Sequence, residues 1–175
     1  MAKPSFTQTQ AYQEGKRQLS LKNFYFNRYL MLRYATACFL FSNLYWLLLL
    51  PGIDLVALLP VSLLVLASLV CLEHLKLYGH VSADVRGKLV YHRYFYISQG
   101  VVNGLLIGLI LTGFGFQQLL PMFSTDVTTR LIVGLIPLLG LWLAWGCVVR
   151  LHKIESNTDA FHAKLVLFEQ SLGSL

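Results

Sequence analysis

The chain has 175 residues, of which 56% are hydrophobic and only 13% are charged, and its formal net charge is +6 at pH 7. Ordinary soluble domains carry about 25% charged residues, so this composition excludes a typical water-soluble domain. The high apolar content also excludes intrinsic disorder. The sequence predicts an integral membrane protein that contacts the lipid bilayer and binds no nucleic acid, since its basic residues flank apolar runs and form no dense patch.

Four apolar runs in the sequence are long enough to cross a bilayer, which takes about 20 residues. The predicted spans cover residues 34–50, 55–77, 94–116 and 131–149. We expect an all-α fold, an integral membrane four-helix bundle with short cytoplasmic amphipathic helices. The expected parts are an N-terminal arm, a four-span domain and a C-terminal amphipathic helix, at residues 1–30, 31–150 and 151–175.

Helix-breaking and helix-capping residues separate the predicted spans. Pro51 to Asp54 divide the first span from the second, because proline and glycine break helices and an aspartate can cap the next one. Gly79 marks the end of the second span. Ser82 or Asp84 can start the third helix, and Ser124 to Asp126 form a start signal for the fourth.

The lysines and arginines predict the orientation of the chain. Of the 14 basic residues, only Arg130 falls in the first or third predicted loop. Because basic residues concentrate on the cytoplasmic side, we expect both termini in the cytoplasm. The first apolar run is too long and too far from the start for a cleavable signal peptide, so we expect a multi-pass protein of a bacterial inner (plasma) membrane.

Glycines recur every four residues in the third span, at Gly100, Gly104 and Gly108. This spacing places them on one helix face, where another helix can approach closely. One interpretation is packing against the other spans of the same chain. The other is an interface with a protein partner or with a second copy of the chain.

Two asparagines are predicted to lie near the middle of the bilayer. Asn43 and Asn103 each follow the tyrosine that opens their span by about nine residues, or roughly 13 Å of helix. An unpaired amide in lipid is costly, so we expect a hydrogen bond between them, with Ser68 at a similar depth. The alternative is a substrate or ion site between the helices.

Glu73 is the acidic residue that lies nearest to lipid in the predicted bundle. We expect an ion pair at the cytoplasmic interface with Arg33, Arg86 or Arg93, and a gating or coupling carboxylate as the alternative. The predicted spans have no ionisable residue in their central halves, which argues against a proton-coupled pump.

Three cysteines lie at similar predicted depths on three different spans. Cys38, Cys71 and Cys147 are accompanied by His74, one turn after Cys71, and thiolate with imidazole suits Zn²⁺ or Cu⁺. No C-x-x-C pair exists and the spacing lacks any local ligand pattern. We therefore expect packing by free thiols, with no metal and no cofactor.

The C-terminal tail has the pattern of an amphipathic helix. Ser156 to Asp159 match a capping box that opens a helix. Its apolar stripe comprises Phe161, Leu165, Phe168 and Leu172. Such a helix either packs beneath the bundle or docks to a cytoplasmic partner.

These features favour a non-catalytic accessory or scaffold subunit of a larger membrane protein assembly, joined to a protein partner or to further copies of itself. The alternative is a small oligomeric transporter or channel, with Asn43, Ser68 and Asn103 along its path. A membrane enzyme that acts at the cytoplasmic face is the third reading. The sequence contains no catalytic motif that we can identify, so we expect no catalytic residues.

Overall fold

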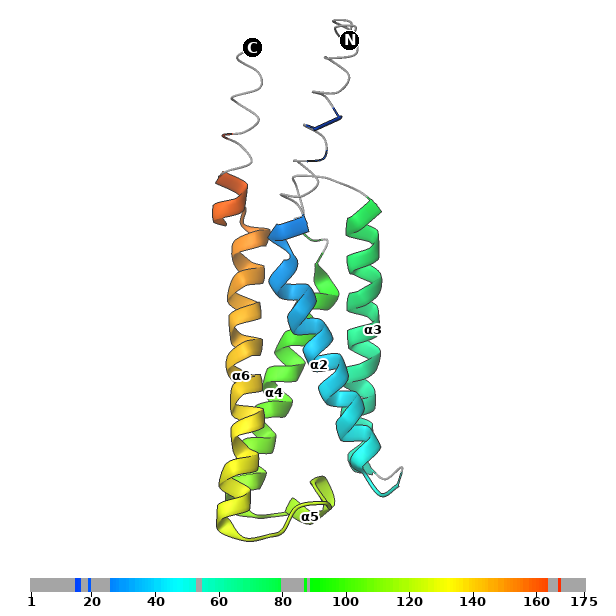
Figure 1. Cartoon of the computed structure of the whole chain (residues 1–175), viewed down its shortest axis with the longest axis vertical. Helices are drawn as coiled ribbons and strands as arrows, with labels where there is room; N and C mark the ends of the chain where they lie inside the picture. Colours follow the sequence, from blue (N-terminus) through cyan, green and yellow to red (C-terminus); the bar gives the residue numbers. More distant parts are fainter. Residues whose placement is uncertain are drawn as a thin grey trace, which may run out of the picture.

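The structure is a computed structural model of the whole chain (Figure 1). It describes residues 26–52, 55–79 and 89–163, together with the separate residues 15, 16, 19, 87 and 167. The described residues are helical and contain no β-strand, which confirms the predicted all-α class. Asp54, Ser82 and Asp84 lie outside them, so the caps predicted at these positions are not described, and neither is Arg86, a predicted ion-pair partner of Glu73.

Four long helices make up the part of the bundle that the structure describes. They are α2, α3, α4 and α6, at Leu30–Leu49, Leu58–Gly79, Val90–Thr112 and Val127–Glu155. A single 3₁₀ turn at Leu55–Ala57 leads into α3, and the short helix α5 covers Phe116–Leu119. We call the end that holds α5 the α5 end, and the end where α2 begins and α6 finishes the opposite end.

Within the described residues, three helical segments are long and apolar enough to cross a membrane: Leu55–Lys76, Val90–Thr112 and Val127–Ala163. The protein thus has the helices of a membrane protein. Helix α2 has 20 residues but is not among the three. It carries Arg33, Thr36 and Asn43, which lower its hydropathy, so a fourth span stays a prediction.

The helices pack as two pairs, α4 with α6 and α2 with α3, and the α4–α6 contact is the most extensive in the bundle. In Figure 1, α2 lies beside α6 near the opposite end and diverges from it toward the α5 end. The α2–α3 pair and the α4–α6 pair are therefore further apart at the α5 end.

Small residues let α4 and α6 approach each other closely. A Cβ atom on Gly140 of α6 would lie 2.6 Å from Nδ2 of Asn103 on α4, closer than side chains tolerate. One turn along, a Cβ atom on Gly100 would lie 3.8 Å from Cβ of Ala144. This contact has the small-residue character of helix interfaces in membranes.

The α5 end departs from the predicted spans because glycines end α4 early. The predicted third span runs to residue 116, but α4 stops at Thr112 and Gly113 follows with φ of 74°. Gly115 has φ of 64°, also in the left-handed region that favours glycine. The chain then forms α5 before α6 begins.

The start signal predicted for the fourth helix is confirmed. Asp126 is the N-cap of α6, and its Oδ2 accepts a hydrogen bond of 2.8 Å from the backbone N–H of Thr129. The Ser124 hydroxyl and the Thr129 donors lower the pKa of this exposed carboxyl to about 2. The capping carboxylate therefore stays ionised down to strongly acidic pH.

Arg28 joins the start of α2 to the segment after α6. Its Nη2 donates to Oδ1 of Asp159 at 2.6 Å and to the backbone oxygen of Ile154 at 3.0 Å, and its Nε donates to Oδ2 of Asp159 at 3.1 Å. Both side chains of the ion pair are almost fully buried. This bidentate bond ties together two parts of the sequence that we expected to be a separate arm and tail.

The predicted capping box at Ser156 is displaced. Ser156 is the C-cap of α6, and its backbone N–H bonds to the oxygen of His152. Helix resumes at Ala160, where the oxygen of Asp159 accepts from the N–H of His162. In the predicted apolar stripe of the tail, the centre of the Phe161 ring lies 5.5 Å from the guanidinium carbon of Arg150. The other members of the stripe, Leu165, Phe168 and Leu172, lie outside the described residues.

Two glycine substitutions test the packing of α4 against α6. Gly140→Leu places a side chain where the Asn103 amide lies, so we expect it to destabilise the protein by at least about 1–3 kcal/mol. Gly104→Leu meets open space, because no atom lies within 4 Å of its Cβ position. This variant should be as stable as the original protein, since leucine favours helix more than glycine.

Thermal unfolding in detergent measures both variants at matched expression. Equal loss of stability in the two variants would contradict this packing. The native size of Gly104→Leu also tests whether Gly104 lies at an interface. If the assembly dissociates into intact subunits, the interface interpretation is supported; if the size is unchanged, the interpretation is wrong.

Candidate functional site

Three amide side chains form a hydrogen-bonded chain inside the bundle. Nδ2 of Asn43 on α2 donates to Oε1 of Gln99 on α4 at 2.8 Å, and Nε2 of Gln99 donates to Oδ1 of Asn103 at 3.3 Å. All three side chains are buried. We call this group the amide chain.

The predicted direct bond between Asn43 and Asn103 is wrong, because Gln99 lies between them and links the two. Ser68 is not part of the group: its side chain is exposed and its hydroxyl donates to the oxygen of Leu64 within α3, at 2.9 Å. A serine on an apolar helix can satisfy its hydroxyl in this way without any partner helix.

The sequence contains a signal for Gln99 that we did not use. His92, Tyr96, Gln99 and Asn103 follow one another at spacings of four, three and four residues, and all four are buried in α4. This spacing marks one helix face. A polar face on an otherwise apolar helix predicts that these side chains point into the bundle.

Asn103 retains an unpaired hydrogen-bond donor. Its side chain is only 5% exposed, and Nδ2 makes no hydrogen bond within the described structure. A buried amide donor without an acceptor costs about 1–3 kcal/mol. Such a group calls for a specific explanation, such as a bound molecule.

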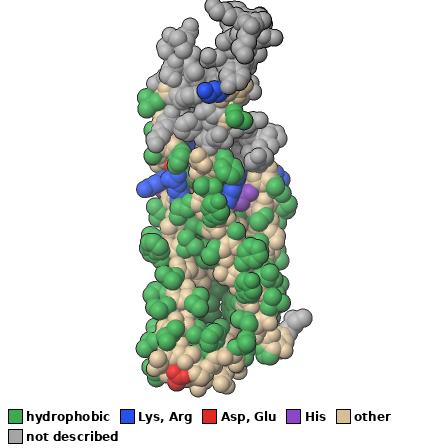
Figure 2. Space-filling model, in the orientation of Figure 1, with side chains coloured by type: hydrophobic (Ala, Val, Ile, Leu, Met, Phe, Trp, Pro, Cys, Tyr) green, Lys and Arg blue, Asp and Glu red, His purple; other side chains and the backbone are tan. Residues whose placement is uncertain are grey.

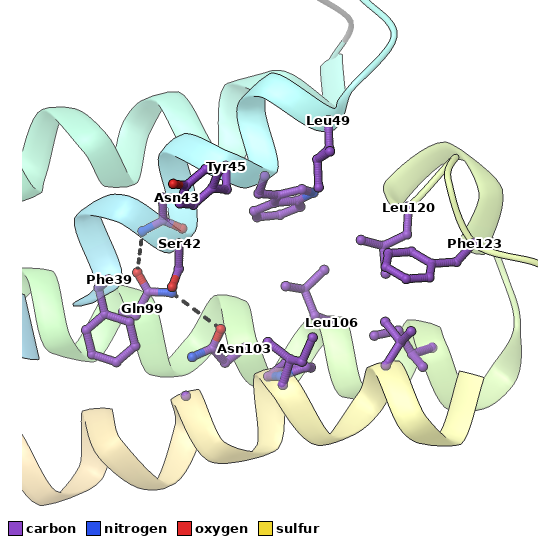
Figure 3. A pocket seen from close by; sticks show the side chains of 16 residues that line it. Phe39, Ser42, Asn43, Tyr45, Leu49, Gln99, Asn103, Leu106, Leu120 and Phe123 are labelled. Carbon is purple, nitrogen blue, oxygen red and sulfur yellow. Dashed lines mark hydrogen bonds between the residues drawn. The ribbon is translucent and has the colours of Figure 1, made fainter. Parts of the chain in front are cut away.

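A cavity of about 330 Å³ lies beside the amide chain, between α2, α4 and α6. Figure 3 shows Asn43, Gln99 and Asn103 toward one end of this space, and Leu120 and Phe123 toward the other. The remaining wall is mostly apolar and includes Leu106, Val133 and Pro137. The cavity thus combines an apolar body with one polar end.

Pro137 adds a second polar group to the wall. Proline has no backbone N–H, so the oxygen of Val133, one turn earlier in α6, has no helical donor. Both residues are buried and both line the cavity. The residues that line the cavity thus include Asn103, whose Nδ2 has no partner within the described structure, and Val133, whose backbone oxygen lacks its usual helical donor.

The α5 segment closes one end of the cavity. Nε1 of Trp46 on α2 donates to the backbone oxygen of Leu119 at 3.0 Å, which holds α5 against α2. The sides are more open, since Tyr45, Leu49 and Ile136 line the cavity and are also exposed at the surface. Figure 2 shows a hollow among hydrophobic side chains in the half of the bundle nearer α5.

A second polar cluster lies near the opposite end, between α3 and α4. Oε2 of Glu73 lies 2.6 Å from Nδ1 of His92, and the Nε2 atoms of His92 and His74 are 3.1 Å apart. The Glu73 carboxylate also accepts from the backbone N–H groups of Tyr91 and His92, at 3.1 and 3.2 Å. Glu73 of α3 therefore caps the first turn of α4.

Among the described residues, Glu73 pairs with His92 and with neither Arg33 nor Arg93. Arg93 points outward and is exposed, Arg86 lies outside the described residues, and the Arg33 guanidinium carbon lies 4.5 Å from the centre of the Phe26 ring. His92 can take the carboxylate because it lies at the start of α4, whose free N–H groups attract an anion.

The three cysteines do not form a common site. Cys38 is exposed, Cys71 is partly buried and Cys147 is fully buried. Within the described residues, no group of three or more histidine, cysteine or acidic side chains is arranged to hold a metal ion. His74, the histidine one turn from Cys71, bonds to His92 instead.

The glycine face divides into two parts. Gly100 packs near Leu141 and Ala144 of α6, whereas the Cβ positions of Gly104 and Gly108 have no atom within 4 Å. Packing within the chain therefore explains Gly100 and not the other two.

Comparison of the chain with protein families, with characterised proteins and with solved structures found no match. The function must therefore be argued from the geometry of the two polar clusters.

A double-mutant cycle tests the amide chain. Asn43→Leu and Gln99→Leu should each lower the free energy of unfolding by roughly 0.6–1.7 kcal/mol, because each breaks the bond between α2 and α4. The double variant should cost less than the sum of the two. Asn43 and Ser68 share no contact, so the free-energy changes of Asn43→Leu and Ser68→Leu should add in the double variant. If the changes of Asn43→Leu and Gln99→Leu also add, the two amides do not interact and the amide chain is wrong.

Proposed function

We propose that the protein binds a small, mostly apolar molecule inside its membrane domain without changing it chemically. The observation that carries this proposal is the unpaired Nδ2 of Asn103 at the polar end of a cavity with apolar walls. Binding pockets for small molecules share this composition, with a few polar groups that fix the orientation of the ligand.

The size and chemistry of the cavity restrict the ligand. An engineered protein cavity of about 150 Å³ holds benzene, so a cavity of about 330 Å³ fits a molecule of roughly two rings. None of the residues that line it is charged, which disfavours an ionised ligand. The free donor of Asn103 calls for an acceptor, such as a carbonyl, ether or hydroxyl oxygen.

The ligand enters sideways from the bilayer in this proposal. Tyr45 and Leu49 of α2 and Ile136 of α6 line the cavity and are exposed, so the opening has apolar rims. It faces outward between α2 and α6, where α2 diverges from α6 in Figure 1. A molecule dissolved in lipid can reach such an opening without passing through water.

The topology that accompanies this function is a four-helix membrane bundle with both termini in the cytoplasm, in a bacterial inner membrane. The distribution of lysine and arginine supports it, and so does the length of α2, whose 20 residues suffice for a span. In this orientation the cavity lies in the half of the membrane away from the cytoplasm, and Glu73 lies near the cytoplasmic side.

An accessory or scaffold role stays a prediction, supported by the open positions beside Gly104 and Gly108. It is compatible with ligand binding, because these glycines are not among the residues that line the cavity. Transport of the bound molecule would require a second opening to the cavity.

Benzophenone is a suitable probe because it has two rings, a single carbonyl acceptor and a photoreactive group. We expect irradiation of the full-length protein in detergent to attach it to cavity residues such as Leu106 and Phe123, as mapped by peptide mass spectrometry. Asn103→Leu should weaken binding by about 3- to 10-fold, the effect of one hydrogen bond.

Two controls sharpen this test. Diphenylmethane has the same rings without the carbonyl, so it should compete more weakly than benzophenone with the original protein and equally well with Asn103→Leu. Ser68→Leu, on an exposed position of α3, should bind as the original protein does. Labelling of outward-facing residues such as Trp142 and Trp145, without competition, would contradict a specific site.

A further inference from the structure

When Glu73 is ionised, the contacts of the Glu73–His92–His74 cluster determine where its hydrogens lie. An ionised carboxylate only accepts hydrogen bonds, so His92 carries its hydrogen on Nδ1, which lies 2.6 Å from Glu73. The Nε2 atom of a neutral His92 is then an acceptor. His74 must therefore carry its hydrogen on Nε2, 3.1 Å away, to complete the second bond.

This arrangement leaves one bare lone pair. Nδ1 of His74 carries no hydrogen, and it is buried with no hydrogen-bond partner within the described structure. The cluster thus has a free basic atom at one end and a carboxylate at the other. Two imidazole rings join them in a continuous line of hydrogen bonds.

The cluster holds a negative charge in a largely enclosed setting. His92 is fully buried and Glu73 is 9% exposed. Its charged neighbours in the described structure are Arg33 from α2, whose charge interacts with His74, and Lys76 from α3, whose charge interacts with Glu73.

The other neighbours of the cluster that the structure describes are neutral. The Tyr96 ring on α4 lies 6.4 Å from that of His92, and its hydroxyl donates to the oxygen of Leu32 on α2. The nearby titratable group of α6 is the buried thiol of Cys147, which lies beside Tyr96.

We propose that Glu73, His92 and His74 form a proton relay that takes up one proton at His74 and stores it on Glu73. The proton binds Nδ1 of His74, while the hydrogen on Nε2 of His74 passes to Nε2 of His92. The hydrogen on Nδ1 of His92 then passes to Oε2 of Glu73. Each ring gains one hydrogen and loses one, so both histidines end neutral with their hydrogens on the opposite nitrogens.

The final state is favoured over a trapped imidazolium on electrostatic grounds. With the proton on Glu73, the cluster holds no charge, whereas a proton kept on either histidine leaves two opposite charges in a buried site. Burial penalises each charge, even when the two are paired.

Proton uptake also changes the contact between α3 and α4. The ionised Glu73 accepts three hydrogen bonds from the first turn of α4, including the N–H groups of Tyr91 and His92. After proton uptake, Oε2 of Glu73 donates to Nδ1 of His92, and the neutral acid accepts the two backbone bonds more weakly, because bonds to an ionised group are the stronger ones. The relay therefore gives the membrane domain a proton-dependent link between these two helices, independent of ligand binding in the cavity.

Nitrogen-15 NMR of the full-length protein with labelled histidines tests the relay directly. At neutral pH we expect hydrogen on Nδ1 of His92 and on Nε2 of His74. On acidification the hydrogens of both rings should move to the opposite nitrogens together. Carbon-13 labelling of glutamate should show Glu73 becoming a neutral acid in the same step.

Variants at two carboxylates complete the experiment. Glu73→Gln cannot accept the proton and should abolish the paired shift, whereas Glu155→Gln, at the end of α6, should leave it intact. An imidazolium on His74 or His92 with Glu73 still ionised would overturn the relay, as would hydrogens that stay in place through the titration of Glu73. Because the original protein alone decides between these outcomes, the test holds even if Glu73→Gln fails to fold.

Discussion

The close approach of α4 and α6 at Gly140 determines how the interior of this bundle is arranged. Nδ2 of Asn103 occupies the space that a Cβ atom would need, and Oδ1 of Asn103 accepts from Gln99. Gln99 in turn holds Asn43 and thereby α2. The cavity lies beyond this bond, where α2 leaves α6, so a larger residue at position 140 would disturb the packing, the amide chain and the cavity together.

The apolar character of the helices makes each unpaired polar atom informative. In lipid, a buried polar group finds no water to replace a missing partner. The described interior pairs most of its polar side chains, including Arg28 with Asp159 and Tyr96 with Thr36. Against this background, four buried side-chain nitrogens lack a hydrogen-bond partner within the described residues: Nδ2 of Asn103, Nδ1 of His74 and the Nε atoms of Arg130 and Arg150. The first two belong to the two polar clusters.

The sequence alone predicted the helical class, because that follows from the apolar composition of the long runs. It also predicted the start of α6 at Asp126, because a helix cap depends on only a few neighbouring residues. The burial of Asn43 and Asn103 also agrees with the expectation that they avoid lipid. The partners of these residues could not be predicted so easily. The sequence does not show which of several polar side chains pairs with Asn43 or with Glu73, so Gln99 and His92 could not be identified as the partners. The Arg28–Asp159 bond joins residues 131 positions apart, and no local pattern indicates such a contact.

One face of α4 unites the two polar clusters. His92, Tyr96, Gln99 and Asn103 are all buried on it, and they contact α3, α2 and α6 in turn. Their outward-facing neighbours Val101 and Leu105 are apolar and exposed. This helix therefore has its polar face inward, and its buried side chains determine where α2 and α3 attach.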